Sequence, residues 1–224
     1  MEISHSNILI VVAHPDDEVL GMGASITKFV NQNCKVFIAF LSDGVTSRNN
    51  QRESAQERKL SAQNCAEFLK VEKVFWGNFP DNQFDSDVQL EINRFVERLV
   101  QITNPAYIFT HHINDLNIDH RKTAEACLVA CRPKAKSEVK GLFSFEVVSS
   151  TNWNFFGLNF KPNLYLDVTQ YINNKMEALK FYNIEMDEYP NARSYDAVYA
   201  LSQYRGTTVG FQFAEAFEII LIRI

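Results

Sequence analysis

The sequence predicts an α/β fold with three layers, in which a Rossmann-like, mainly parallel sheet carries helices on both faces. Short apolar, β-branched runs alternate along the chain with longer stretches of helical apolar periodicity. The first run, residues 7–13 (NILIVVA), has no polar break, which is typical of a strand buried on both faces. The 224 residues show no repeat, linker or low-complexity tract, so residues 1–224 are expected to form one domain.

The elements follow in chain order from these patterns. Strand 7–13 leads into a helix whose apolar face spans residues 20–30, and the apolar run 36–41 then gives a strand that ends at the turn Ser42-Asp43-Gly44. A long polar helix at about 52–69, a strand at 74–76, a helix over 88–102 and a strand at 106–110 repeat the pattern. The expected remainder is a helix at about 120–131, strands near 142–147 and 164–167, helices over 172–184 and 195–204, and a strand at 216–222.

Composition narrows the classes of partner. A net charge of −5 gives no basic field, which argues against nucleic acid and acidic membrane surfaces. The start has no basic region, and the apolar run breaks at His14, so we expect no signal peptide, no transmembrane segment and a cytoplasmic protein. The 4 cysteines lack disulfide-framework or CxxC spacing; Cys127 and Cys131 could share a helix face as a metal pair, although buried small side chains are the commoner outcome. With 18 Phe and 8 Tyr, the surface is compatible with a homo-oligomer.

Charge is concentrated where the first strand ends, in His14-Pro15-Asp16-Asp17-Glu18. A dinucleotide fingerprint fits poorly, because the G-x-G that follows lacks its third glycine and the carboxylates would repel a pyrophosphate. Helix capping explains one aspartate, but not a histidine and an aspartate three residues apart beside a buried strand. A divalent cation explains both, since His and Asp are good zinc ligands.

A second polar cluster follows the strand at 106–110, and it contains His111, His112, Asp115, Asp119 and His120. Ligands bind outside the carboxyl ends of parallel strands, so both clusters are expected at one edge of the sheet. The second cluster can supply the third ligand of a catalytic metal centre whose fourth position is left for water. The cofactor predicted is Zn²⁺, with Fe²⁺ or Co²⁺ also compatible with such ligands.

Together, AHPDDE with its following G-x-G and the downstream Asp119-His120-Arg121 resemble the PIG-L / LmbE-like metal-dependent N-deacetylases. Weaker similarities include FLSDG at 40–44, FEVVSSTNW at 145–153 and KMEALKFY at 175–182, so the resemblance covers most of the chain. The resemblance implies that His14, Asp17 and His120 are the metal ligands and that Asp16 is the general base. Such a base takes a proton from a water molecule whose pKa the metal has lowered toward ~7.

One departure from the family pattern concerns the leaving amine. Many members have H-x-D-H where this chain has Asn117-Ile118-Asp119-His120. Asn117 can donate a hydrogen bond but cannot supply a proton, so Asp16 is expected to protonate the amine, with His112 as the alternative. Asp119 is interpreted as a carboxylate that orients a metal ligand or as a helix N-cap.

Three further residues are candidates for substrate contact. Arg58 falls near a family position associated with sugar hydroxyls, although its surroundings have the composition of a solvated helix face. Arg193 follows Pro190 in a loop, and Trp153 could stack on a sugar ring or simply pack.

The predicted function is therefore a zinc-dependent hydrolase that removes acetyl from an N-acetylated amino sugar or glycoconjugate. The alternatives are an amidase acting on another small amide or thiol conjugate, and a metal-binding protein without turnover.

Overall fold

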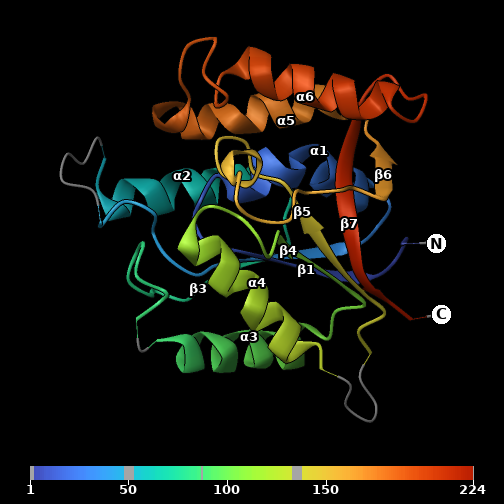
Figure 1. Cartoon of the computed structure of the whole chain (residues 1–224). Coiled ribbons are helices and arrows are strands. Elements are labelled where there is room, and N and C mark those ends of the chain that lie inside the picture. Colours follow the sequence, from blue (N-terminus) through green and yellow to red (C-terminus); the bar gives the residue numbers. More distant parts are fainter. Residues whose placement is uncertain (1–2, 48–52, 87, 133–137, 224) are drawn as a thin grey trace.

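The strands form one mixed sheet in the computed structural model, which describes residues 3–47, 53–86, 88–132 and 138–223 (Figure 1). The strands are β1 Asn7–Val12, β2 Lys35–Phe40, β3 Lys73–Trp76, β4 Tyr107–His111, β5 Gly141–Phe145, β6 Leu164–Asp167 and β7 Ala214–Ile222. Their order is β3-β2-β1-β4-β5-β7-β6. The pairs from β3 to β5 are parallel, and β7 runs antiparallel to β5 and β6. The predicted mainly parallel sheet is confirmed.

Helices cover both faces of this sheet. They are α1 Asp17–Asn31, α2 Ala55–Phe68, α3 Gln89–Thr103, α4 Ile118–Ala130, α5 Ile172–Leu179 and α6 Tyr195–Thr207, with 3-10 helices η1 Thr151–Trp153 and η2 Lys180–Glu185. Helices α1, α2, α5 and α6 lie on one side, and α3 and α4 lie on the other (Figure 1). In the described ranges, no helix is both long enough and apolar enough to cross a membrane.

Strand β1 separates two hydrophobic cores. Ile8, Ile10 and Val12 pack into the core beneath α1 and α5. Leu9 and Val11 face the opposite core, beneath α3 and α4. A central strand that is buried on both faces has no position for a polar side chain, which explains the uninterrupted apolar run.

Several boundaries differ from the predicted ones because of local hydrogen bonds. Helix α2 begins at Ala55 after a capping box formed by Ser54 and Glu57, whereas its predicted start at position 52 lies outside the described residues. Helix α4 begins at Ile118 because Asn117 caps it. The helix predicted over 172–184 changes at Leu179 to the 3-10 helix η2, within which the backbone of Tyr182 is not helical. Strand β5 ends at Phe145, two residues before its predicted end. Strand β7 begins at Ala214, two residues before its predicted start.

Helix α1 is interrupted at Met22, between the two glycines that follow the charged turn. A buried ion pair fills the break: Lys175 Nζ donates to Leu20 O at 2.8 Å and to Glu215 at 2.7 Å. Glu215 in turn accepts from the backbone N–H groups of Ala24 and Ser25 at 3.1 and 2.6 Å. Three backbone groups beside the interruption therefore find side-chain partners inside the protein.

Gly21 has a packing role in this helix. A Cβ atom at this position would lie 2.2 Å from the ring of Phe145 on β5. Only glycine allows α1 to approach the sheet this closely. The first glycine of the G-x-G sequence thus serves helix–sheet packing here.

The topology brings the two polar clusters together. Strands β1 and β4 are neighbours, and the chain turns to opposite sides of the sheet from this pair, since β2 and β3 lie beyond β1 and β5 lies beyond β4. Such a switch point leaves a crevice at the carboxyl ends of the strands. Residues 13–17 and 111–120 follow these two strand ends.

Candidate functional site

The turn after β1 has an uncommon backbone. Asp16 has φ 111° and ψ −30°, a backbone conformation that residues other than glycine rarely adopt. Its carbonyl accepts from the N–H groups of Val19 and Leu20 at 3.1 and 2.9 Å, and the His14 N–H donates to Asp17 Oδ2 at 2.9 Å. These bonds hold the strained turn so that His14, Asp16 and Asp17 all lie at the strand end.

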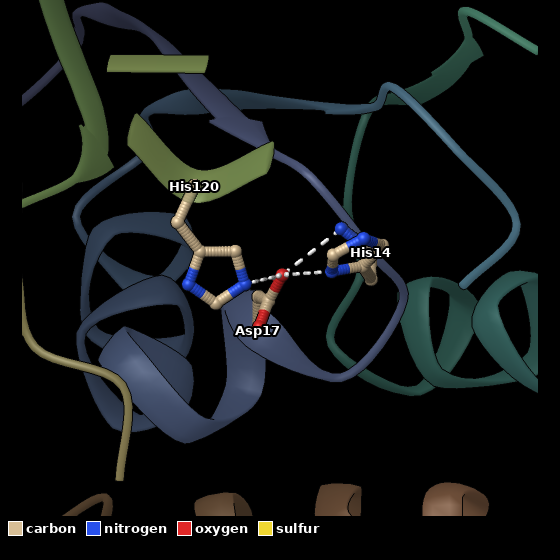
Figure 2. Close-up of side chains that lie close together, drawn as sticks. All are labelled: His14, Asp17 and His120. Atoms are coloured by element: carbon tan, nitrogen blue, oxygen red, sulfur yellow. Dashed lines mark hydrogen bonds and ion pairs between the residues drawn. The ribbon is translucent and has the colours of Figure 1, made fainter. Parts of the chain in front are cut away.

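His14, Asp17 and His120 converge on one point (Figure 2). Asp17 Oδ2 lies 3.5 Å from His14 Nδ1 and 3.3 Å from His120 Nε2. All three candidate ligand atoms lie within 4.8 Å of one another. Asp17 Oδ1 is buried and has no hydrogen-bond partner in the described part of the chain. An unsatisfied carboxylate oxygen beside two imidazoles is a donor set that suits a divalent cation.

Electrostatics also favour positive charge at this point. Burial acts to lower the pKa of His120, but Asp17 and Asp115 outweigh it and raise the pKa to about 9. The pKa of His14 is likewise raised well above its usual value, because Asp119, Asp17 and Asp81 outweigh burial. Burial acts to raise the pKa of Asp17, yet the neighbouring histidines bring it well below its usual value. The cluster therefore attracts positive charge, which a cation can supply in place of protons.

Three carboxylates orient the two imidazoles. His14 Nε2 lies 3.1 Å from Asp119 and 3.3 Å from Asp81, while His120 Nδ1 lies 3.2 Å from Asp115. Carboxylates behind metal-binding histidines fix the ring orientation and the tautomer. The sequence placed Asp115 in the second polar cluster without a separate role and did not single out Asp81. The available signal was their position, since each follows a strand of the parallel sheet.

Of the two roles that the sequence suggested for Asp119, the contact with a candidate metal ligand is observed, and the N-cap role belongs to Asn117. Asn117 caps α4, because its side-chain oxygen accepts from the Asp119 N–H at 2.8 Å. Asp119 does not cap the helix, and its carboxylate accepts from the N–H groups of Asn82 and Phe84 at 2.7 and 3.1 Å. Asp119 thus joins the segment after β3 to His14.

The structure keeps His111 and His112 away from the cavity. His111 is fully buried and stacks on His120 at 3.9 Å, and its Nε2 accepts from the Ala13 N–H at 2.9 Å. Burial and the nearby His120 lower the pKa of His111 to about 3, so this imidazole is neutral. His112 faces Glu218 at 3.3 Å instead. The expectation that His112 protonates the leaving amine therefore finds no support in its position.

Asp16 lies on the same cavity and contacts two arginines. Arg193 donates to Asp16 Oδ2 at 2.7 Å and to Ser149 Oγ at 3.0 Å, and Arg58 lies 3.8 Å from Asp16. Burial raises the pKa of Asp16 and Asp17 adds to the increase, while Arg193 and Arg58 act in the opposite direction.

Arg58 is buried, which differs from the solvated helix face that its sequence context suggested. Its guanidinium contacts Glu53 and Glu185 and donates to the carbonyl oxygen of Pro15 at 3.0 Å. Two carboxylates compensate the buried charge, so the arginine stabilises the turn that carries Asp16. Trp153 does not line the cavity and is largely exposed, with its ring 5.1 Å from that of Phe155.

The cavity has a volume of about 300 Å³. Its lining is mostly polar and comprises His14, Pro15, Asp16, Gly44, Arg58, Asp81, Asn82, Leu116, Asn117, His120, Ser149, Ser150 and Arg193. This arrangement can hold a cation, a water molecule and a small polar group beside a buried carboxylate.

The sequence is similar to a known protein family and to two known deacetylases. The model of the PIG-L family, described as GlcNAc-PI de-N-acetylase, matches residues 9–131. YaiS, an uncharacterized deacetylase of Escherichia coli K12, is 26% identical over 182 residues, covering 77% of this chain and 88% of YaiS. The diacetylchitobiose deacetylase of Thermococcus kodakarensis is 23% identical over 231 residues, covering 95% of this chain and 82% of that enzyme.

The fold itself is shared with proteins of other activity. The structure of GalB, the 4-carboxy-2-hydroxymuconate hydratase of Pseudomonas putida KT2440, matches with a TM-score of 0.79 at 17% identity, covering 98% of each chain. A likeness at this identity concerns the fold alone. The reaction has to be argued from the residues of the site.

Proposed function

The chain belongs to the PIG-L family of deacetylases, and from this premise we propose that it is a metal-dependent hydrolase that removes acetyl from an N-acetylated amino sugar or glycoconjugate. The observation that carries the proposal is the convergence of His14, Asp17 and His120 at a cavity that Asp16 also lines. Two histidines and one aspartate are a catalytic zinc set with an open position, and Fe²⁺ or Co²⁺ are compatible with it.

The three ligands would hold the cation, and Asp119, Asp81 and Asp115 would keep the imidazoles in position. A divalent cation bound there lowers the pKa of a water molecule and polarises the amide carbonyl. His111 takes no part as a ligand, because its Nε2 already accepts from a backbone N–H.

Asp16 takes the proton from the water molecule. Its raised pKa makes the carboxylate a better base than an exposed aspartate, and the bond from Arg193 keeps it oriented. The same carboxyl then gives this proton to the amine as the C–N bond breaks. One residue thus serves both steps, which the absence of a histidine at position 117 requires.

Asn117 has a supporting role. Its oxygen is used to cap α4, and its amide nitrogen lies 3.4 Å from Asn82 Oδ1 on the cavity wall. The side chain can therefore donate a hydrogen bond to the substrate, but it cannot act as an acid.

The lining of the cavity supports a polar substrate. Arginine, asparagine and serine side chains supply donors and acceptors that suit sugar hydroxyls and an acetamido group. An amidase acting on another small amide or thiol conjugate would use the same residues. A metal-binding protein without turnover is the alternative from a different class.

The test is acetate release from N-acetylated sugars offered free, nucleotide-linked and lipid-linked. Metal-loaded protein is compared with the same protein in the presence of a chelator. Chelator-sensitive release from one class supports the deacetylase and identifies its substrate class. Hydrolysis of the amide in a thiol conjugate instead supports the amidase. If metal is bound but no compound is hydrolysed, the result supports the metal-binding protein without turnover.

A further inference from the structure

A short segment beside the cavity exposes an unusual amount of apolar surface. Trp153, Phe155, Phe156 and Leu158 are 60%, 71%, 103% and 75% exposed. We call residues 153–158 the aromatic loop. Single exposed apolar residues are normal, but four large ones within six positions form a patch of the kind that marks an interaction site.

The aromatic loop is attached to the site through hydrogen bonds. Thr151 Oγ1 donates to Asp115 at 2.5 Å, and Ser150 Oγ donates to the same carboxylate. Asp115 lies 3.2 Å from His120 Nδ1, so the segment just before the aromatic loop shares a partner with a candidate metal ligand. Further along, Asn154 Nδ2 donates to Asn114 O at 2.7 Å. The exposed side chains therefore project from a segment fixed relative to the cavity.

The rim of the cavity connects the polar lining of the cavity with the exposed side chains of the aromatic loop. Ser149 and Ser150, a few residues before the aromatic loop, line the cavity, as does the half-exposed Leu116. Leu116 belongs to the segment that Asn154 holds. A cavity of about 300 Å³ is at the lower end for ligand pockets and suits a single sugar residue, so the rest of a larger substrate must lie across the rim.

We propose that the aromatic loop binds the apolar aglycone of an amphiphilic glycoconjugate whose N-acetyl sugar occupies the cavity. This inference rests on the proposed function and gives its substrate class. The loop contributes affinity by burying apolar area, at roughly 25 cal/mol per Å², which the polar cavity cannot do. The net charge of −5 gives no attraction to an anionic bilayer, which favours a single amphiphile as the occupant.

The experiment compares the octyl and methyl glycosides of N-acetylglucosamine, with the octyl compound below its micellar concentration. The loop variant combines Phe155→Ser, Phe156→Ser and Leu158→Ser. The matched control combines Leu90→Gln and Ile102→Gln on α3, whose side chains are 56% and 61% exposed. The readout is the ratio of kcat/KM for the two glycosides.

We expect the wild type and the control to prefer the octyl glycoside by about tenfold or more, and the loop variant to lose most of this preference. Equal ratios in the loop variant and the wild type would overturn the proposal. Vesicle co-sedimentation that the loop variant loses while its ratio stays unchanged would also overturn it and assign the loop to a bilayer.

Binding to the aromatic loop can also be measured by tryptophan fluorescence, which does not depend on hydrolysis. The chain has 2 tryptophans, so Trp76→Phe leaves Trp153 as the reporter. If no glycoside is hydrolysed, the proposed function fails, but a blue shift of Trp153 emission with the octyl and not the methyl glycoside still supports the loop as an apolar-ligand site. No shift with either compound overturns it.

Discussion

Replacement of Asp16 by asparagine separates the general base from the metal ligands. Asparagine has nearly the same shape and tolerates positive φ better than most residues, so the turn with φ 111° can be retained. The amide oxygen can still accept from Arg193, but the amide cannot take a proton from water.

The expected magnitude follows from these contacts. Loss of general acid–base catalysis lowers kcat by about 10²–10⁴-fold, or roughly 3–5 kcal/mol of barrier. The 2.7 Å bond from Arg193 keeps its charged donor but loses the negative charge on its acceptor, which costs about 1 kcal/mol of stability, and removal of a buried charge offsets part of it. Metal affinity should change by less than about threefold, since Asp16 is not among the converging ligand atoms.

The assay measures acetate release and bound metal on the same preparations of wild type, Asp16→Asn and Asp17→Asn. Asp17→Asn should lose metal and activity together. Loss of metal in Asp16→Asn equal to that in Asp17→Asn would mean that the two aspartates are assigned the wrong way round. Retention of more than about a tenth of wild-type kcat would show that Asp16 is not the base.

Three other predictions use different measurements. His120→Ala should lose bound metal and activity together by metal analysis, and a variant that keeps its zinc would refute the three-ligand centre. Arg193→Met removes a contact that lowers the pKa of Asp16; because the base acts when ionised and loses activity as pH falls through its pKa, the acid limb of kcat/KM should move to higher pH. An unchanged acid limb would show that the contact between Arg193 and Asp16 does not set the pKa that controls the rate. Gly21→Ala should destabilise the fold by about 1–3 kcal/mol in urea unfolding, since its Cβ would meet the Phe145 ring at 2.2 Å; unchanged stability would mean that this ring relaxes freely.

The order of strands and helices could be predicted from the sequence because periodicity reports burial directly. The run from Ile8 to Ala13 is apolar throughout, and β1 is buried on both faces. Boundaries were less predictable where side chains act on the backbone. The cap supplied by Asn117 and the interruption of η2 at Tyr182 depend on contacts that no periodicity encodes.

The candidate site divides in the same way. The densities of His and Asp after two strands indicated a metal centre, because unpaired charges beside a buried strand need a partner. Arg58 was a candidate for substrate contact in a segment with the composition of a solvated helix face, and its burial was not predictable because only the fold brings Glu185 to it. Asp81 belongs to no recognisable sequence motif. It lies close to His14 because of the position of β3 in the sheet.

The sequence by itself determined the alternating α/β pattern and the residue types of a candidate metal site, since both are properties of local spacing and chemistry. The resemblance to the family had already implied His120 as a ligand, and the tertiary structure alone decided how the neighbouring histidines are held. His111 and His120 stack on each other, but the backbone N–H of Ala13 occupies Nε2 of His111, while His120 Nε2 faces Asp17. A hydrogen bond across 98 residues of sequence separation is set by the pairing of β1 with β4, and no local pattern contains it.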